Sequence, residues 1–245
     1  MSRVAHRVAL VTGADNPRGI GRACVRALAE AGFEVACTIE PSRGRVEGPQ
    51  EAALVVPADL AGPSAPVRLL DAVGDVLGPV AALVNNAAVS ERDGFEHLDA
   101  ATLDRHHAVN VRATALLSCE VARRLGSDPA LRIPGRIVSL TSGQFLGPMP
   151  GELAYTATKG AIEAFTRQLA AEVAHLGITV NAVGPGPTDT GWIDDALRAE
   201  LVERFPARRI GEPADAARLV TWLCSPDAAW VTGQVIHSEG GFRRG

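Results

Sequence analysis

Tyr155 and Lys159 are the residues of this chain whose types and spacing best suit proton transfer. Tyr155 is the only tyrosine among 245 residues, and Lys159 is the only lysine, because all the other members of the Lys+Arg total of 24 are arginines. A spacing of four residues places both side chains on one face of a helix. There the ammonium would favour ionisation of the phenol and lower its pKa, which is about 10 in an unperturbed tyrosine. The pair is therefore a candidate acid–base group for work near neutral pH.

The use of lysine at this one position is itself informative. A lysine ammonium is a compact charge whose pKa changes with its surroundings, whereas a guanidinium is planar and permanently charged. Ser142 follows the apolar run at 137–140, so we expect its hydroxyl at the end of a strand, thirteen residues before Tyr155. A Y-x-x-x-K spacing alone also fits an ordinary solvated helix start, so the interpretation depends on the elements around it.

A glycine-rich turn near the start of the chain has the features of a phosphate-binding site. The apolar run at 8–11 leads into TGADNPRGIG at 12–21, and a helical pattern follows until Gly32. Glycines let the backbone approach a pyrophosphate, and a helix N-terminus offers free N–H groups and the positive end of its dipole. Turn glycines are common, but the position of these between a strand and a helix favours a dinucleotide site.

The end of the second predicted strand bears on the choice between NAD and NADP. An Asp or Glu at this place binds the ribose hydroxyls of NAD, but here the residue is Ile39. A 2′-phosphate would find partners in Arg18, Ser42 and Arg43, which favours NADP(H). Glu40 follows directly and would accept the ribose hydroxyls if the turn shifted by one residue, so NAD(H) also remains compatible.

The remaining patterns alternate between strand and helix. We expect further strands at 54–56, 80–84, 133–140, 178–183 and 234–236, and helices at 67–77, 101–125, 155–175 and 213–224. This alternation predicts an α/β domain. Between the last two of these units a loop-and-helix excursion at 188–211 is well placed to cover a substrate.

Six polar positions lie inside or next to these apolar patterns. Asn85, Asn86 and Asn181 are expected to tie strands together, because an amide in an apolar run must be hydrogen-bonded. Asn110 lies in the middle of a predicted helix, where asparagine is unfavourable unless it has a role. The two histidines at 106–107 are interpreted as surface or partly buried residues, and no metal site is expected.

Composition restricts the class of protein. The chain is 47% hydrophobic, with a net charge of −4 and a pI near 5.9, which gives no general attraction to nucleic acid or anionic membranes. No apolar run approaches the roughly 20 residues of a membrane span, and the first residues show no signal-peptide pattern. The scattered cysteines are expected to be free thiols in a reducing compartment, which favours the cytoplasm. They are Cys24, Cys37, Cys119 and Cys224.

Together these motifs resemble the single-domain short-chain dehydrogenases/reductases, in particular the 3-oxoacyl-acyl-carrier-protein-reductase-like branch, from Arg7 to about Phe242. The matching residues are Thr12-Gly13, Gly19-Ile20-Gly21, Asp59, Asn85-Asn86-Ala87, Asn110, Ser142, Tyr155, Lys159, Pro185-Gly186 and Thr188. Each motif alone is weak, but their order and spacing are specific. The resemblance implies a Rossmann-type doubly wound parallel sheet of about seven strands with helices on both faces. Residues 1–245 would form a single dinucleotide-binding and catalytic domain, with a substrate lid at about 188–211.

The resemblance also implies a catalytic tetrad of Asn110, Ser142, Tyr155 and Lys159. Tyr155 would protonate the developing alkoxide, and Ser142 would hydrogen-bond the carbonyl oxygen. Lys159 would lower the pKa of Tyr155 and hold the nicotinamide ribose. Asn110 would position a water that passes protons toward Lys159, and the reduced nicotinamide would supply hydride.

Cofactor and substrate residues are implied in the same way, with Asp59 near the adenine amino group and Thr188 near the carboxamide. The expected cofactor contacts are Gly13, Asp15, Arg18, Gly19, Ile20, Gly21, Ile39, Asp59, Leu60, Asn86, Ala87, Ala88, Tyr155, Lys159, Pro185, Gly186 and Thr188. The expected substrate contacts are Ser142, Gln144, Met149, Tyr155 and Trp192. The chain departs from the family pattern twice. Five residues instead of three separate Gly13 from Gly19, and Asn-Asn-Ala-Ala stands where Asn-Asn-Ala-Gly is usual.

The predicted function is an NADP(H)-preferring oxidoreductase of the EC 1.1.1 type that interconverts a small ketone, such as a 3-oxoacyl thioester, and a secondary alcohol. The family typically forms homotetramers, so a tetramer or dimer is expected. A non-catalytic dinucleotide-binding sensor or scaffold is the alternative, disfavoured because Tyr155 and Lys159 are both present. Epimerisation or dehydration would usually require a larger substrate domain. An acyl-carrier protein would need a basic rim, for which Arg123, Arg124 and Arg167 are candidates.

Overall fold

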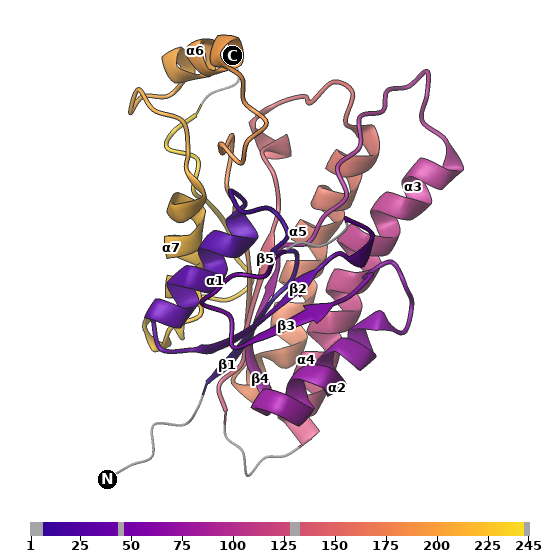
Figure 1. Cartoon of the computed structure of the whole chain (residues 1–245), viewed down its shortest axis with the longest axis vertical. Coiled ribbons are helices and arrows are strands. Elements are labelled where there is room, and N and C mark those ends of the chain that lie inside the picture. Colours follow the sequence, from indigo (N-terminus) through magenta and orange to yellow (C-terminus); the bar gives the residue numbers. More distant parts are fainter. Residues whose placement is uncertain (1–6, 44–46, 128–132, 243–245) are drawn as a thin grey trace.

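Seven β-strands form one parallel sheet in the computed structural model of this chain, and helices cover both of its faces (Figure 1). The structure describes residues 7–43, 47–127 and 133–242. The strands are β1 Val8–Val11, β2 Glu34–Ile39, β3 Leu54–Pro57, β4 Val80–Asn85, β5 Arg136–Leu140, β6 Thr179–Gly184 and β7 Val235–His237. Their order is β3-β2-β1-β4-β5-β6-β7, so the winding reverses between β1 and β4. This is the predicted doubly wound sheet, and ligands of such sheets bind beyond the carboxyl ends of the strands at the reversal point.

Strand β1 shows why a continuous apolar run becomes a central strand. All four of its residues are buried. Val8 and Leu10 pack into the apolar core on one face of the sheet, and Ala9 and Val11 pack into the core on the other face. Side chains alternate along a strand, so a run without polar positions is satisfied only where helices cover both faces.

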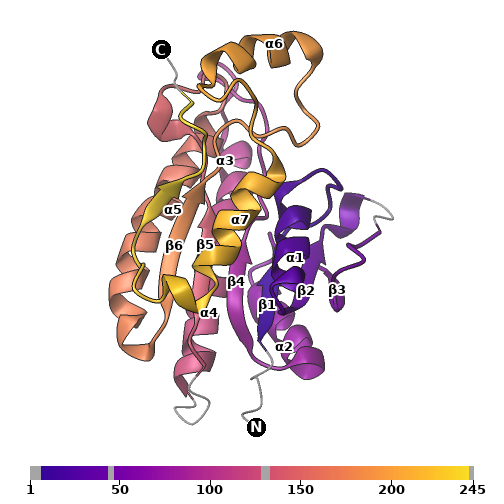
Figure 2. The ribbon, with the colours of Figure 1, turned by 90° about the vertical axis from the view of Figure 1, so that its left-hand side faces the viewer.

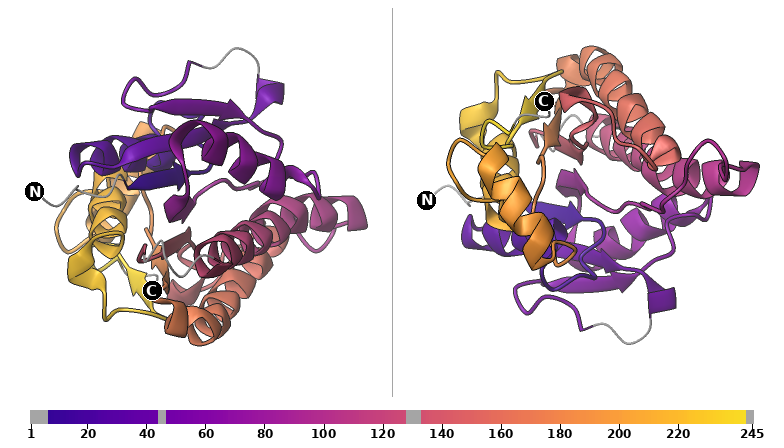
Figure 3. Two further views of the ribbon diagram at one scale, coloured as in Figure 1. Left: turned by 90° about the horizontal axis from the view of Figure 1, so that it is seen from below. Right: turned by 90° about the horizontal axis from the view of Figure 1, so that it is seen from above.

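The helices divide between the two faces, as the views along and across the sheet show (Figures 2 and 3). One face carries α1 Ile20–Glu30 and α7 Pro213–Leu223, which pack against each other. The other carries α2 Ala65–Leu77, α4 Thr114–Ser127 and α5 Leu153–Val173. Each helix contributes an apolar stripe to the core, such as Cys24, Val25 and Leu28 of α1. The periodicity of these stripes is what made the helices recognisable in the sequence.

The long helix predicted at 101–125 is divided into three parts. Helix α3 spans Ala100–His106, a π-helical segment spans His107–Ala113, and α4 follows. Asn110 lies in the π-helical segment, where the wider turn departs from ordinary helical spacing. The predicted strand at 133–140 is shorter than expected because β5 begins at Arg136, two residues after a proline that has no N–H for the sheet.

The segment 188–211 leaves the sheet after β6 and returns to almost the same place. Thr188 and Gly211 form a parallel bridge, and the amide of Asp189 donates to the carbonyl of Gly211 at 2.9 Å. Between these ends α6 Asp195–Arg204 lies above the carboxyl edge of the sheet (Figure 1). A separate apolar cluster holds this segment, formed by Ile193, Leu201, Phe205, Ile210 and Phe242, with Leu146 packed against it.

The four cysteines all lie in the described part of the chain and are free thiols, as predicted. Cys24, Cys37 and Cys224 are buried. Burial raises the pKa of Cys37 to about 11 and that of Cys224 to about 12, so these thiols stay protonated at neutral pH. Within the described ranges, no helix has the length and apolarity needed to cross a membrane.

Candidate active site

Tyr155 and Lys159 lie in the first two turns of α5, at the carboxyl edge of the sheet. The residue before this helix, Glu152, makes no side-chain cap hydrogen bond to the described residues. The cap comes instead from Asp93, in the loop after β4. Its carboxylate accepts from the amide of Leu153 at 2.7 Å and from the amide of Ala154 at 2.8 Å. A residue 60 positions earlier in the chain therefore fixes the start of the helix that carries Tyr155.

Lys159 is buried at the end of β5. Its side chain is 4% exposed, and its Nζ donates to the carbonyl oxygen of Leu140 at 2.9 Å. Burial penalises the ammonium and lowers the pKa of Lys159 to about 8. The Nζ atom lies 5.4 Å from the centroid of the Tyr155 ring. The two side chains thus share one face of the helix, as the spacing predicted.

The pKa of Tyr155 differs from the prediction. In this structure it is raised, because burial penalises the phenolate more than the hydrogen bond from Ser142 stabilises it, and the charge of Glu152 raises the pKa further. The prediction that Lys159 lowers this pKa is therefore wrong for the protein alone. The ammonium is directed to the carbonyl of Leu140, and burial weakens its own charged form. At neutral pH the phenol is protonated.

Asn110 joins three parts of the site. Its Oδ1 accepts from the amide of Val89 at 2.8 Å, and its Nδ2 donates to the carbonyl of Val89 at 2.9 Å and to Oγ1 of Thr158 at 3.0 Å. These bonds use both amide hydrogens. Asn110 therefore connects the π-helical segment to the loop after β4 and to the residue before Lys159, and its side chain has no hydrogen left for a water.

His106 corrects a second prediction. It was interpreted as a surface or partly buried residue, but it is fully buried. Its Nδ1 lies 2.8 Å from the carbonyl of Thr102, and its Nε2 accepts from the amide of Glu91 at 3.1 Å. This pattern requires the neutral ring with its hydrogen on Nδ1. His106, Asn110 and Asp93 thus hold successive residues of the loop after β4, next to the active-site helix.

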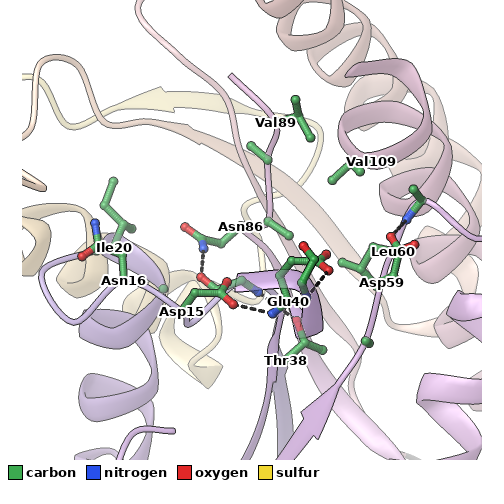
Figure 4. A pocket seen from close by; sticks show the side chains of 18 of the residues that line it. Asp15, Asn16, Ile20, Thr38, Glu40, Asp59, Leu60, Asn86, Val89 and Val109 are labelled. Carbon is green, nitrogen blue, oxygen red and sulfur yellow. Dashed lines mark hydrogen bonds between the residues drawn. The ribbon is translucent and has the colours of Figure 1, made fainter. Parts of the chain in front are cut away.

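A cavity of about 590 Å³ lies along the carboxyl edge, between the glycine turn and the ends of β2, β3 and β4 (Figure 4). Many of the predicted cofactor residues line it. They are Gly13, Asp15, Gly19, Ile20, Gly21, Asp59, Leu60, Asn86, Ala87 and Ala88. Sequence reasoning missed several further lining residues, namely Asn16, Thr38, Ala58, Ala61, Val89, Arg105, Val109 and Thr190. Five of these adjoin predicted cofactor residues in the chain, whereas Arg105, Val109 and Thr190 reach the cavity only through the tertiary fold.

Two glycines of the turn have no room for a side chain. A Cβ on Gly21 would lie 2.3 Å from the carbonyl oxygen of Gly13, and one on Gly13, where φ is 73°, would lie 2.7 Å from Cα of Ala87. Asn86 fixes this approach, because its Nδ2 donates to the carbonyls of Thr12 and Gly13 at 2.9 and 2.8 Å. The other two asparagines also tie strands as predicted: Asn85 donates to Ser139 of β5, and Asn181 donates to the carbonyl of Val231 before β7.

The predicted 2′-phosphate site is only partly formed. Arg18 and Ile39 are not among the described residues that line the cavity, whereas Ser42 and Glu40 are. Arg18 instead lies against Asp189, with its Nη2 3.2 Å from Oδ1. The side chain of Arg43 lies outside the part of the chain that the structure describes. An exposed guanidinium is attracted to a nearby negative charge, and here that charge is the carboxylate of Asp189.

The remaining cofactor predictions fall outside this cavity as the described residues form it: Tyr155, Lys159, Pro185, Gly186 and Thr188. They lie at the same edge of the sheet, after β5 and β6. Asp59 lines the cavity, and its carboxylate also accepts from the amide of Ala61 at 2.8 Å, a turn-forming role.

Of the predicted substrate residues, Ser142 hydrogen-bonds to Tyr155, and Gln144 and Trp192 make contacts elsewhere. Nε2 of Gln144 donates to Oε1 of Glu163 at 2.6 Å. The indole N–H of Trp192 donates to the carbonyl of Thr188 at 2.9 Å, and its ring is half exposed. Met149 is half-buried in the loop between β5 and α5. The exposed Phe145 stacks on His237, a contact that sequence reasoning missed, with ring centroids 3.4 Å apart.

The arginines considered for a carrier-protein rim all have acidic partners. Arg123 and Arg124 pair with Glu120, and Arg124 also pairs with Asp71 at 2.7 Å. Arg167 lies 3.7 Å from Glu163 one turn earlier on α5. These are the pairs of ordinary solvated helix faces.

Comparisons with known proteins show the family of the chain. Residues 13–243 match the family model described as enoyl-(acyl carrier protein) reductase. The uncharacterized oxidoreductase YjdA of Bacillus subtilis is 47% identical over 253 residues, covering 100% of both chains. A 3-oxoacyl-(acyl-carrier-protein) reductase FabG of Staphylococcus epidermidis is 32% identical, covering 97% of this chain and 99% of the relative. Among solved structures, acetoin dehydrogenase YohF from Salmonella typhimurium superposes with a TM-score of 0.83 at 31% identity, covering 97% and 96% of the two chains.

Proposed function

Because the chain belongs to the short-chain dehydrogenase/reductase family, we propose that it is an NAD(P)(H)-dependent enzyme of the EC 1.1.1 type that interconverts a small ketone and a secondary alcohol. One observation carries this proposal. Tyr155 and the buried Lys159 lie on one face of α5, beside Ser142, at the sheet edge that also holds the glycine-turn cavity. Fold alone would not license a reaction, but this group of side chains does.

The glycine turn fits a dinucleotide. Gly13 and Gly21 leave a cradle that a Cβ would fill. Gly19 precedes α1 and makes no side-chain cap bond to the described residues, so the first N–H groups of the helix are available to a pyrophosphate. A bound nicotinamide would supply or accept the hydride. Asp59 and Leu60 would contact the adenine, and Lys159 and Thr188 the nicotinamide end.

The acid–base roles follow from the pKa directions. A raised pKa keeps the phenol of Tyr155 protonated at neutral pH, which is the form needed to donate a proton to an alkoxide during carbonyl reduction. Ser142 would hydrogen-bond the carbonyl oxygen. Lys159, with a pKa near 8, would exchange protons near neutral pH. Asn110 would complete the tetrad through the segment it anchors, because both hydrogens of its side-chain amide are already donated.

We retain NADP(H) as the preferred cofactor. The support is that β2 ends at Ile39 and that Ser42 lines the cavity. Glu40 opposes this preference, but its Oε1 accepts from the amide of Ser42 at 3.2 Å and so serves the turn after β2. A Glu40→Gln variant removes the charge and keeps an acceptor. It should strengthen NADP(H) binding relative to NAD(H) by about threefold or more, since a like charge nearby costs a phosphate about 1 kcal/mol. A wild-type preference for NADH would contradict the proposal.

The remaining proposals concern the protein as a whole. The chain would act as one domain in the cytoplasm on a small carbonyl or alcohol, with 188–211 as a substrate lid contributing Trp192. A homo-oligomer, tetramer or dimer, is supported by exposed aromatic surface near the edge strand β7, where Trp230 is 98% exposed and Trp222 is 41% exposed.

The test is nicotinamide absorbance with NADPH and, separately, NADH. Substrates would include simple ketones, acetoin and its diketone, and an acetoacetyl thioester, because two of the similar proteins named above are an acetoin dehydrogenase and a 3-oxoacyl-(acyl-carrier-protein) reductase. Turnover that is lost in Tyr155→Phe supports the reaction. Tight cofactor binding without turnover on any substrate would favour the alternative, a non-catalytic dinucleotide sensor.

A further inference from the structure

Asp189 is the centre of a charged contact that no role in the proposed reaction explains. Its side chain is 14% exposed. It accepts from Nη2 of Arg18 at 3.2 Å, from the guanidinium of Arg198, and from the amide of Gly191 at 3.0 Å. The bond from Arg198, together with the Gly191 amide and the charges of both arginines, holds the pKa of this carboxyl below its usual range. Asp189 is therefore ionised throughout the neutral range.

Two partners of Asp189, Gly191 and Arg198, lie in its own segment 188–211, and the third, Arg18, comes from another part of the fold. Arg18 belongs to the glycine turn after β1, whereas Arg198 lies on α6. Asn16 adds a second connection, because its Nδ2 donates to the carbonyl of Thr190 at 2.8 Å. The Oδ1 of Asn16 accepts from the amide of Arg18 at 2.9 Å, which fixes the side chain in this direction. Two adjacent residues after β6 are thus bound to two residues of the glycine turn.

The length of the glycine turn makes this contact possible. Five residues separate Gly13 from Gly19, two more than the common family pattern, and both Asn16 and Arg18 lie among them. Asn16 and Thr190 both line the cavity, so the hydrogen bond between them lies at the proposed cofactor site.

The internal contacts of segment 188–211 connect Asp189 to the rest of that segment. Its ends are joined by the Thr188–Gly211 bridge and by the hydrogen bond from Asp189 to Gly211. Its apolar cluster also includes Phe242 from outside the segment, and Phe205 packs on this residue with ring centroids 4.8 Å apart. The segment is thus closed at its base and packed together by apolar side chains, and Asp189 lies at its base.

We propose that Asp189 is a positioning residue, which docks segment 188–211 onto the lengthened glycine turn through Arg18 and Asn16. The docking couples the cofactor site to the segment that covers the substrate. In this proposal Arg18 holds the segment in place and does not bind a 2′-phosphate. The coupling to substrate rests on the proposed function, whereas the docking itself does not.

Hydrogen exchange of the amides in α6 and residues 190–194 tests the docking without cofactor or substrate. The variants are Arg18→Ala, Asp189→Ala and the double variant. Arg26→Ala is the matched control, because Arg26 is as exposed as Arg18 (63% against 64%) and makes one ion pair of 3.0 Å, with Glu51. We expect exchange in these amides to rise about threefold in Arg18→Ala, the scale of a weak ion pair, and more in Asp189→Ala. Arg18→Ala should add nothing in the Asp189→Ala background, and Arg26→Ala should leave these amides unchanged.

Two results would overturn the proposal. One is an additive effect of the two substitutions, because residues that act through one contact must be coupled. The other is unchanged exchange in Arg18→Ala combined with a selective loss of NADPH affinity over NADH, which would make Arg18 a phosphate ligand. On an active substrate, Arg18→Ala should raise KM about threefold and keep the ratio of NADPH to NADH turnover. A protein without turnover would contradict the proposed function alone, because the exchange measurement would still decide the docking.

Discussion

Removing the Asp93 carboxylate should disturb catalysis more than it disturbs the fold. Asp93 accepts two backbone N–H groups at the start of α5, two residues before Tyr155. Loss of a helix N-cap typically costs about 1–2 kcal/mol of unfolding free energy, and hydrogen bonds to a charged group are at the upper end of the range for hydrogen bonds. Because Asp93 is half-buried, we expect Asp93→Ala to lower the free energy of unfolding by about 1.5 kcal/mol, a value within those limits.

The same loop provides a matched control. Asp99 caps α3, where its Oδ1 accepts from the amide of Thr102 at 2.8 Å. Asp99→Ala should therefore also lower the free energy of unfolding, without removing a hydrogen bond from α5. Only Asp93→Ala frees the first turn of the helix that carries Tyr155. Displacements of catalytic groups by less than 1 Å reduce rates strongly, so we expect kcat to fall about tenfold in Asp93→Ala.

Urea unfolding and steady-state kinetics on both variants separate the two effects. Amide hydrogen exchange at Leu153 and Ala154 would report fraying of the helix start directly. Equal losses of kcat in Asp93→Ala and Asp99→Ala would refute the reasoning, because the effect would then follow stability and not the position of Tyr155. Unchanged exchange at Leu153 in Asp93→Ala would refute it as well.

Three further predictions follow from burial and close approach. The pKa of Lys159 is about 8 in the folded protein, and its reference value is 10.5. Between these two pH values the unfolded chain binds more protons than the folded protein. The free energy of unfolding should therefore rise with pH from about 8 to 10. This rise amounts to at most about 3 kcal/mol and should be absent from Lys159→Met. Urea unfolding of both proteins at pH 7 and 10 would check this prediction. An equal change of unfolding free energy with pH in both proteins would contradict it. In Gly21→Ala the new Cβ would meet the carbonyl of Gly13 at 2.3 Å, so cofactor affinity measured by calorimetry should fall about tenfold or more and stability by about 1–3 kcal/mol. Gly74→Ala, with open space around its Cβ, is the control and should bind cofactor normally. Phe145→Ala removes the stack on His237 and should lower stability by about 1 kcal/mol; a change below 0.3 kcal/mol in thermal unfolding would show that the stack does not contribute.

Much of the fold could be predicted from the sequence because its signals are local. Apolar runs such as 8–11 and 178–183 indicate strands buried on both faces, and the stripes of α1 and α7 indicate helices that pack on them. The glycine turn was recognisable from its place between strand and helix. Tyr155 and Lys159 were recognisable from a spacing of one helical turn. These features depend on residues near one another in the chain.

The irregularity of the helix around Asn110 could not be predicted from the apolar pattern of the sequence. A periodic apolar pattern from 101 to 125 predicts one helix, but the structure widens it into a π-helical segment around Asn110. Within this segment Asn110 is hydrogen-bonded to Val89 and Thr158, which are 21 and 48 residues away. Apolar periodicity does not record such polar contacts between elements.

Contacts between distant residues were decided by the tertiary structure alone. The cap from Asp93 to α5 spans 60 residues, and the contact of Arg18 with Asp189 spans 171. A charged side chain at the surface has several possible partners, and only the packing of the sheet selects one. The pKa of Tyr155 depends in the same way on how deeply the fold buries the phenol, since burial raises this pKa and the hydrogen bond with Ser142 lowers it. Sequence spacing thus determined which residues share the site, whereas the three-dimensional packing determined their partners and their charge states.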